Sequence, residues 1–342
     1  MTKHPPIASQ AELQPLLELT QRVGRDPLLT QGSTGNSSAK ADGVLWIKAS
    51  GRWMEDALRD DFLAPLDLAE VTECLQRGMD PAERYPRASL ETAMHAALPH
   101  RIVVHVHCVN TIAWAVRSDA PVQLQSRLEG LRWQWVPYTA SGLPLAREIE
   151  RALSACPDAN VFVLGNHGLV IAGEDACSVE RLLAEVRKRL AIAPREAHPA
   201  DYTSLMEIAN DSPWDLPDDD GIHALGTDVT SQAILAKGLL YPCQAIFSDC
   251  RTPELFRPVP YFDALEEDRS RYGNRPFLIV EGRGVLVGRG MSAAELAMIS
   301  GLAQVVLRLG GATPVRYLTG AEVAVLSGQV AYHYRELASA GR

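Results

Sequence analysis

The sequence lacks three features: a long apolar run, a paired-cysteine motif and an excess of basic residues. No apolar stretch approaches the ~20 residues that a helix needs to cross a bilayer, so we expect no membrane span. The residues after Met1 are polar, and no apolar signal core follows them. The six cysteines form no C-x-x-C pair, which favours free thiols in a reducing compartment. We therefore expect a cytoplasmic protein.

The charge balance argues against another class of partner. The chain has 33 Lys and Arg against 42 Asp and Glu, a formal net charge of −9. Nucleic acid is therefore not expected as the main partner, and an anionic substrate would need a local cluster of donors. At 342 residues with 46% hydrophobic composition, the chain is long enough for two domains, each with a core.

Two histidines stand one residue apart at the end of an apolar strand pattern, in the segment Arg101-Ile-Val-Val-His-Val-His107. Residues i and i+2 of a strand point to the same face. His105 and His107 should therefore project side by side. Such a pair suits a metal ion, and a polar strand end is the alternative.

Two other segments carry matching ligand types. Ser89-Leu-Glu91 opens a helical pattern that leads into this strand, and Gly165-Asn-His167-Gly168 is a turn between two apolar strands. Three histidines and one carboxylate have the ligand chemistry of a catalytic zinc site. The structural alternative for Glu91 is an ordinary place in the first turn of a helix.

Small polar residues flank a strand predicted at Val44–Lys48. Gly32–Ser38 precedes this strand and Ala49–Arg52 follows it. Backbone N–H groups and hydroxyls in such loops can face an anion, so the two loops could form two walls of a phosphate pocket. Plain flexible loops are the alternative. Three cations are candidate charge partners: Lys40, Lys48 and Arg52.

Composition changes in the middle of the chain, where prolines and an acidic run occur between residues 194 and 221. We expect a connector there. A metal-binding domain is predicted at residues 1–193 and a C-terminal α/β domain at 222–342. The charged stretch 55–78 is expected to be helical.

The C-terminal domain contains an echo of the first. Residues 277–287, followed by a helix with a Ser292/Glu295 capping box, have the strand–turn–strand–helix pattern of residues 162–190. Aligning the glycines places Arg283 opposite His167. This degenerate half-repeat is expected to bind no metal.

Together these motifs resemble the class II aldolase/adducin family, closest to the aldolase part of bifunctional rhamnulose-phosphate aldolase/dehydrogenases. The carriers of the resemblance are Gly35–Lys40, Trp46–Gly51, Arg87–Glu91, His105–His107 and Gly165–Gly168. The resemblance implies an α/β fold, a three-layer α/β/α domain with a central, mostly antiparallel sheet. The smaller C-terminal α/β domain lies outside it.

The resemblance also implies roles for individual residues. His105, His107 and His167 would bind Zn²⁺ or another divalent transition metal. Glu91 would be the general acid/base, and it could also ligate the metal ion when no substrate is bound. One departure is Leu90, which stands where some members carry a second serine. The positions that match the family's phosphate-binding residues are Asn36, Ser50, Gly51 and Ser89.

The implied function is a zinc-dependent lyase that cleaves a small phosphorylated sugar by a retro-aldol reaction through a metal-stabilised enediolate. A decarboxylase or epimerase of a related sugar-acid or pentulose phosphate would use the same enediolate. The family also includes non-catalytic, adducin-like interaction proteins, which are expected to lose the metal ligands, so the intact set favours an enzyme. Because members are commonly tetramers, a homo-oligomer (tetramer or dimer) is expected.

Overall fold

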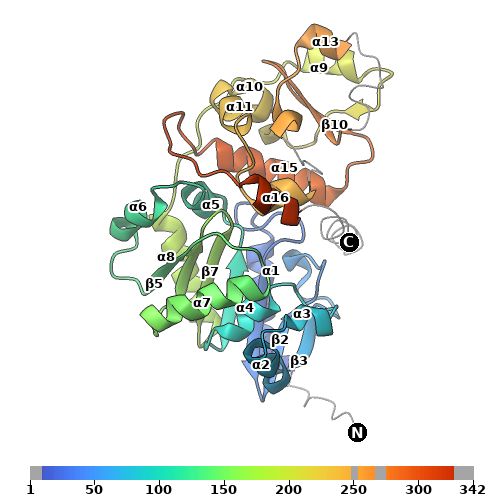
Figure 1. Ribbon diagram of the computed structural model, residues 1–342. Coiled ribbons are helices and arrows are strands. Elements are labelled where there is room, and N and C mark those ends of the chain that lie inside the picture. Colours follow the sequence, from blue (N-terminus) through green and yellow to red (C-terminus); the bar gives the residue numbers. More distant parts are fainter. Residues whose placement is uncertain (1–9, 248–252, 266–274, 327–342) are drawn as a thin grey trace. The chain divides into compact units, whose positions relative to one another are not determined.

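The structure is a computed structural model that describes residues 10–247, 253–265 and 275–326 (Figure 1). Within these residues the chain divides into two compact units. The first comprises residues 10–115 and 119–191, and the second comprises 116–118 and the described residues from 192 onward. No helix in the described ranges is long and apolar enough to cross a membrane.

The first unit is built on a seven-stranded sheet with the order β3-β2-β1-β4-β7-β6-β5. Neighbouring strands are antiparallel except β5 and β6, which are parallel. The strands are β1 (Asn36–Ala41), β2 (Val44–Lys48), β3 (Leu63–Asp67), β4 (Ile102–Val106), β5 (Trp133–Val136), β6 (Val161–Leu164) and β7 (Gly168–Gly173).

Helices cover both faces of this sheet, which gives the three layers that were expected. On one face α4 packs against α2 and α7, and on the other α1 packs against α8 (Figure 1). The helices of this unit are α1 (Gln10–Gly24), η1 (Met54–Asp56), α2 (Leu68–Gln76), α3 (Pro81–Arg84), α4 (Thr92–Ala97), α5 (Val109–Ala115), α6 (Ala120–Arg127), α7 (Leu143–Ala155) and α8 (Ala176–Arg189).

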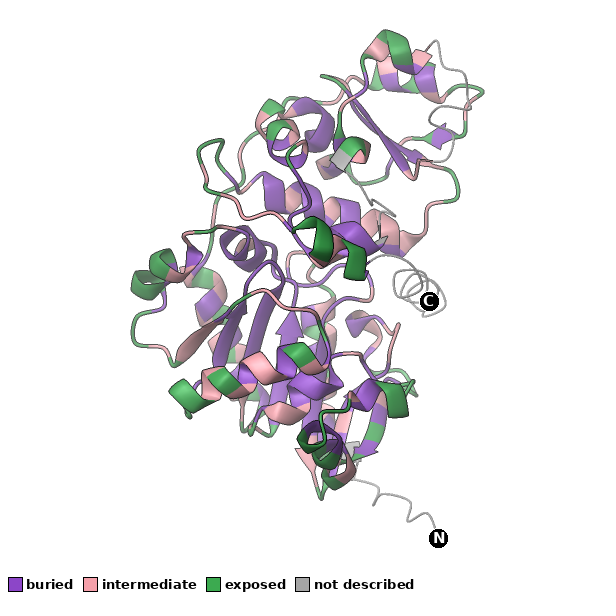
Figure 2. Ribbon diagram, in the orientation of Figure 1, coloured by how far each residue is buried: buried purple, intermediate pink, exposed green. Residues whose placement is uncertain are grey.

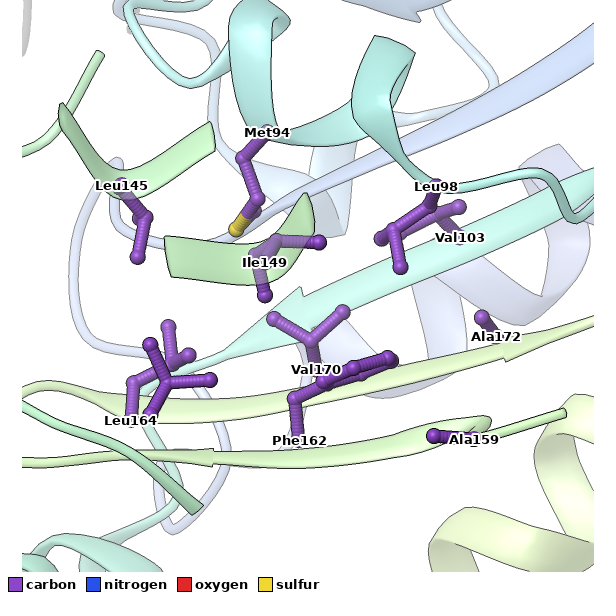
Figure 3. Close-up of a cluster of buried hydrophobic side chains, with 11 residues drawn as sticks. Met94, Leu98, Val103, Leu145, Ile149, Ala159, Phe162, Leu164, Val170 and Ala172 are labelled. Atoms are coloured by element: carbon purple, nitrogen blue, oxygen red, sulfur yellow. The ribbon is translucent and has the colours of Figure 1, made fainter. Parts of the chain in front are cut away.

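A buried hydrophobic cluster holds α4 and α7 on the sheet (Figure 3). Met94 of α4 and Leu98, which directly follows α4, pack here with Ile149 of α7, Phe162 of β6 and Val170 of β7. All five side chains are fully buried. Burial of an aromatic or large aliphatic side chain contributes about 1.5–3 kcal/mol, so this cluster anchors the start of α4 beside the ends of the central strands.

Two sequence predictions in this unit are wrong in part. Residues 63–67, expected to be helical, form β3. This strand lies at the sheet edge, where Pro65 is tolerated because an edge strand leaves some N–H groups unpaired. The loop predicted at Gly32–Ser38 becomes strand β1 from Asn36 onward. Its Asn, Ser and Ala residues have low strand propensity, and pairing on both sides makes them a strand.

The second unit has a three-stranded antiparallel sheet with the order β8-β10-β9. The segment 194–221, expected as a connector, contributes helix α9 and strand β8 to this second unit. The described elements of the second unit are α9 (Tyr202–Ala209), β8 (Trp214–Asp215), η2 (Asp220–His223), α10 (Ala224–Thr227), α11 (Val229–Leu235), α12 (Pro242–Phe247), η3 (Pro253–Phe256), α13 (Tyr261–Leu265), β9 (Phe277–Val280), β10 (Gly284–Gly288), α15 (Ala293–Val306) and α16 (Gly320–Leu326).

The predicted echo is present in the backbone register. Val280 pairs with Gly284 as Leu164 pairs with Gly168, and a helix follows each hairpin. The side chain of Arg283 forms an ion pair with Asp201. The sequence also predicts a final helix from a Thr319/Glu322 capping box to about Leu337. The structure describes this helix as α16 up to Leu326, and the rest lies outside the described residues.

Replacing Phe162 with alanine should lower the free energy of unfolding by about 3–5 kcal/mol, because the cavity left in a well-packed core cannot collapse fully. Denaturant unfolding followed by tryptophan fluorescence measures this, since five of the six tryptophans lie in the first unit. Val122, which is 69% exposed, provides the control: Val122→Ala should change the free energy by about 0.5 kcal/mol or less. Equal effects would contradict the packing described here.

Candidate metal centre

Two central strands bring polar side chains to one face of the sheet. Asn36 of β1 lies directly opposite His105 of β4. Cross-strand partners share a face, so both side chains point toward the layer that contains α4. His107 follows the last residue of β4 and lies beside His105, with their Nε2 atoms 3.1 Å apart. The surrounding strands are buried (Figure 2).

The third histidine is placed by a tight turn. His167 lies between β6 and β7, directly after Asn166, whose φ is +50°. Asparagine tolerates this left-handed conformation better than most residues. The next residue must be small, because a Cβ on Gly168 would lie 2.5 Å from the carbonyl oxygen of Val106 and 3.2 Å from the His105 ring. Glycine therefore lets the turn approach the histidine strand closely.

The three imidazoles converge on one point. Their ring centroids are 4.9, 4.9 and 5.1 Å apart, and one nitrogen from each ring lies within 4.8 Å of the others. The Nδ1 of His105 donates to the carbonyl oxygen of Leu169 at 3.1 Å. In the neutral form, an imidazole that donates through Nδ1 has its lone pair on Nε2, and Nε2 of His105 is the atom that lies close to His107 and Glu91.

Glu91 is the N-cap residue of α4 and is 7% exposed. Its Oε2 lies 3.3 Å from Nε2 of His105, and its Oε1 lies 3.4 Å from Nε2 of His167. Each oxygen also accepts a hydrogen bond. Asn36 Nδ2 donates to Oε2 at 2.7 Å, and the hydroxyl of Ser141 donates to Oε1 at 3.2 Å. The carboxylate is thus held against the imidazoles from two sides.

Burial and charge set the protonation states in this cluster. Burial raises the pKa of Glu91, but His105, His167 and the hydrogen bond from Asn36 outweigh it and hold that pKa below its ordinary value. Burial lowers the pKa of His167 to about 4 and that of His107 well below its ordinary value. At neutral pH these two imidazoles are therefore uncharged, the form that binds a metal ion.

The donor chemistry fits a divalent transition metal ion. Three imidazoles converge beside one carboxylate, and a backbone carbonyl orients His105 from behind, as is usual for metal-binding histidines. Among the described residues, only His105, His107 and His167 form such a group. These three would be its ligands.

The expected phosphate residues lie on segments next to this centre. The hydroxyl of Ser89 accepts from Asn36 Nδ2 at 3.2 Å. The backbone N–H of Ser50 donates to the carbonyl of Arg87, which brings the turn containing Gly51 (φ +77°) close to the segment that carries Ser89. Asn36 and Ser89 therefore contact each other, whereas Ser50 and Gly51 approach them through the backbone.

The candidate cations Lys40 and Lys48 have different contacts in the structure. Lys48 is 3% exposed, and its ammonium group donates to the carbonyls of Ser33 (3.0 Å) and Arg52 (2.5 Å), joining the two small-residue loops. Burial lowers its pKa to about 7, although Glu91 acts in the opposite direction. Lys40 instead donates to the carbonyl of Leu98.

Two residues near Glu91 were not singled out from the sequence. Ser141 is exposed, yet its hydroxyl reaches the buried carboxylate. It precedes Gly142, whose φ is +84°, and Asp80 accepts from the next backbone N–H, that of Leu143, at 2.9 Å. The other residue is His95, one helical turn after Glu91. The four-residue spacing, which places both residues on the same side of a helix, was the only sequence signal for it.

Comparison with known proteins assigns a family to this arrangement. The model of the class II aldolase and adducin N-terminal domain matches residues 14–193, just over half of the chain. The chain belongs to the class II aldolase and adducin family. All metal-centre residues described above lie within the matched range.

Individual relatives are distant. An uncharacterized oxidoreductase of Bacillus subtilis, YuxG, is 27% identical in an alignment of 184 residues that covers 47% of this chain and 26% of that protein. The N-terminal class II aldolase domain of a Thermoplasma acidophilum protein has a TM-score of 0.48 and 20% identity, covering 56% of this chain and 97% of that one. L-fuculose-1-phosphate aldolase of Thermus thermophilus has a TM-score of 0.37 and 19% identity, and the match covers 52% of this chain and 92% of that one.

Acid should destabilise the metal-free protein. Buried histidines with lowered pKa values stay neutral in the folded state, whereas in the unfolded chain they bind protons below pH ~6.5. The free energy of unfolding should therefore fall as pH drops from about 6.5 to about 4, by up to about 1.4 kcal/mol per pH unit for each such group. Urea unfolding in chelator across this range measures the slope.

Variants assign this slope to particular rings. His167→Gln should reduce the slope, because burial lowers the pKa of His167 to about 4. His198, which is exposed, provides the control, and His198→Gln should leave the slope unchanged. A slope that survives His167→Gln intact would show that this ring is not held neutral in the fold.

Proposed function

We propose that this protein is a metal-dependent lyase of the class II aldolase type that cleaves a sugar phosphate by a reversible retro-aldol reaction. One observation carries the proposal. Three buried imidazoles converge beside a buried carboxylate, the group required to combine a Lewis acid with an acid/base residue. A non-catalytic interaction domain would have no need to keep four such groups buried together.

Glu91 transfers the proton. Its lowered pKa makes it a carboxylate at neutral pH, so it can take the proton of the substrate hydroxyl as the carbon–carbon bond breaks. The protonated Glu91 then gives a proton to the carbon of the resulting enediolate, which completes the three-carbon product, and the reverse reaction uses the same two transfers in the opposite order. Asn36 and Ser141 hold its two oxygens, which fixes the direction from which the proton is accepted. A bound divalent ion supplies Lewis-acid stabilisation of the negative charge that develops on the carbonyl oxygen.

The phosphate of the substrate binds to Asn36, Ser50, Gly51 and Ser89, with Lys48 as its charge partner. Support comes from the buried ammonium of Lys48, which joins the loop that leads into Asn36 to the turn that contains Ser50 and Gly51. A phosphate dianion nearby would favour the charged form of this lysine. Binding the phosphate away from the reacting bond orients the carbon skeleton toward Glu91.

Related reactions can be distinguished from aldol cleavage by their products. An epimerase or decarboxylase of the family's substrate class would use the same residues, so assays should detect aldehyde release, a changed sugar and carbon dioxide in parallel. The closer likeness to the rhamnulose-phosphate branch stays a prediction, as does assembly into a homo-oligomer. Rhamnulose and fuculose phosphates are suitable first substrates for the screen.

Elemental analysis of the purified protein tests the metal centre. We expect about one zinc, manganese, iron or cobalt ion per chain, and loss of that ion in the double variant His105→Ala/His107→Ala. The variant His198→Ala, at an exposed position, should keep the ion. Wild-type protein that stays metal-free after incubation with zinc would refute the lyase proposal and favour an interaction protein.

Removing the charge of Glu91 tests the acid/base role. Glu91→Gln keeps the size of the side chain but cannot take up the proton, so turnover should fall by about 100-fold or more while bound metal is retained. The control Glu83→Gln, at an exposed position, should leave turnover unchanged. Undiminished turnover in Glu91→Gln would exclude this residue as the proton-transfer group.

A further inference from the structure

A second pair of buried polar residues lies behind the proton-transfer group. On α4, His95 follows Glu91 by four residues, and on β1, Ser38 follows Asn36 by two. Four helical residues rise by about 6 Å and two strand residues by about 6.7 Å, so the two pairs match in length. Asn36 contacts both Glu91 and His95, and Ser38 contacts His95.

Chemistry fixes the direction of every hydrogen bond in this row. The ionised carboxylate of Glu91 can only accept, so Nδ2 of Asn36 faces it, at 2.7 Å. The amide oxygen Oδ1 must then face Nε2 of His95, with which it is in contact. Because an amide oxygen only accepts, the proton of the His95 ring is on Nε2.

The other ring nitrogen of His95, Nδ1, also has a hydrogen-bond partner. Burial lowers the pKa of His95 to about 3, so the ring is neutral and Nδ1 carries a lone pair. The hydroxyl of Ser38 lies 2.7 Å from Nδ1 and donates to it. His95 and Ser38 are 0% exposed and Asn36 is 4% exposed, so water has little access to replace a missing partner.

We propose that His95 is a positioning residue whose Nε2–H fixes the orientation of the Asn36 amide and, through it, the Glu91 carboxylate. The donors run in one direction, from Ser38 to His95, then to Asn36, and finally to Glu91. A flipped Asn36 amide would place its oxygen against the carboxylate and repel it. The proposal rests on the proposed role of Glu91 as the proton-transfer group.

The ring tautomer can be tested without any substrate. Nitrogen NMR of the histidine rings in the metal-free protein should show His95 protonated on Nε2 and accepting at Nδ1. A ring protonated on Nδ1 would overturn the proposal, because it could not hold the amide in this orientation. Failure to find a substrate would count against the lyase function, whereas the NMR result would still decide whether His95 carries its proton on Nε2.

Two substitutions at His95 separate positioning from general stability. Gln can replace the Nε2–H donor, whereas Leu fills the space without donating. His95→Leu should lower kcat by about 10–100-fold, as is typical when an outer-shell partner is lost, and His95→Gln should restore most of it. Both variants should keep the bound metal, because the three ligand histidines are unchanged. Equal kcat in the two variants, or parallel loss of metal and kcat, would contradict a positioning role.

Substitutions at Ser38 provide a route if His95→Leu does not fold. Ser38→Ala removes the donor to Nδ1 and leaves that buried nitrogen without its hydrogen bond, whereas Ser38→Thr keeps a hydroxyl. We expect Ser38→Ala to lower kcat, because the ring is held less firmly, and to shift the Nδ1 signal of His95 toward that of a nitrogen without a hydrogen bond, and Ser38→Thr to resemble the wild type. Unchanged kcat and ring signals in Ser38→Ala would overturn the proposed donor row.

Discussion

The pairing of Asn36 with His105 on adjacent antiparallel strands is the contact on which the site depends. It sets one amide and one imidazole on the same face of the sheet, below the start of α4. The same register places Ser38 opposite Val103, which belongs to the hydrophobic cluster under α4. A shift of one residue would turn both polar side chains to the opposite face, so strand register and site geometry are inseparable.

Buried polar groups are costly unless they find partners, and this centre shows how partners can be supplied. Neutral rings avoid the larger cost of buried charge, and backbone carbonyls or side chains satisfy their N–H groups, as Leu169 does for His105. Glu91, which is ionised, receives two hydrogen bonds. Lys48, the last residue of β2, donates to two carbonyl oxygens of the neighbouring loops. The arrangement is therefore preorganised.

The second unit contains the same hairpin with an arginine at the position of the histidine. The β9–β10 hairpin has the register of β6–β7, and Arg283 occupies the position that corresponds to His167. Its guanidinium pairs with Asp201 and lies 5.2 Å from the centroid of the Tyr261 ring. These contacts link the hairpin turn to neighbouring segments of its own unit, so a cation there stabilises local packing.

The sequence by itself determined those features that depend only on a short stretch of residues. Alternation placed His105 and His107 on one strand face, glycines marked the turn at His167, and apolar runs identified β4, β6 and β7. His105, His107, His167 and Glu91 could be singled out as a candidate site because residue chemistry and short spacing carry that information. Capping boxes likewise located the starts of α15 and α16.

Tertiary structure alone decided what depends on distant segments. Strand β1 has a polar sequence and is a strand because it pairs with β2 and β4, and the edge position of β3 accommodates Pro65. The roles of His95, Ser38 and Ser141 required knowing that α4, β1 and the loop before α7 meet at Glu91. No local pattern records such a meeting, because the partners are separated by 50 or more residues and only the packed fold brings them within hydrogen-bonding distance.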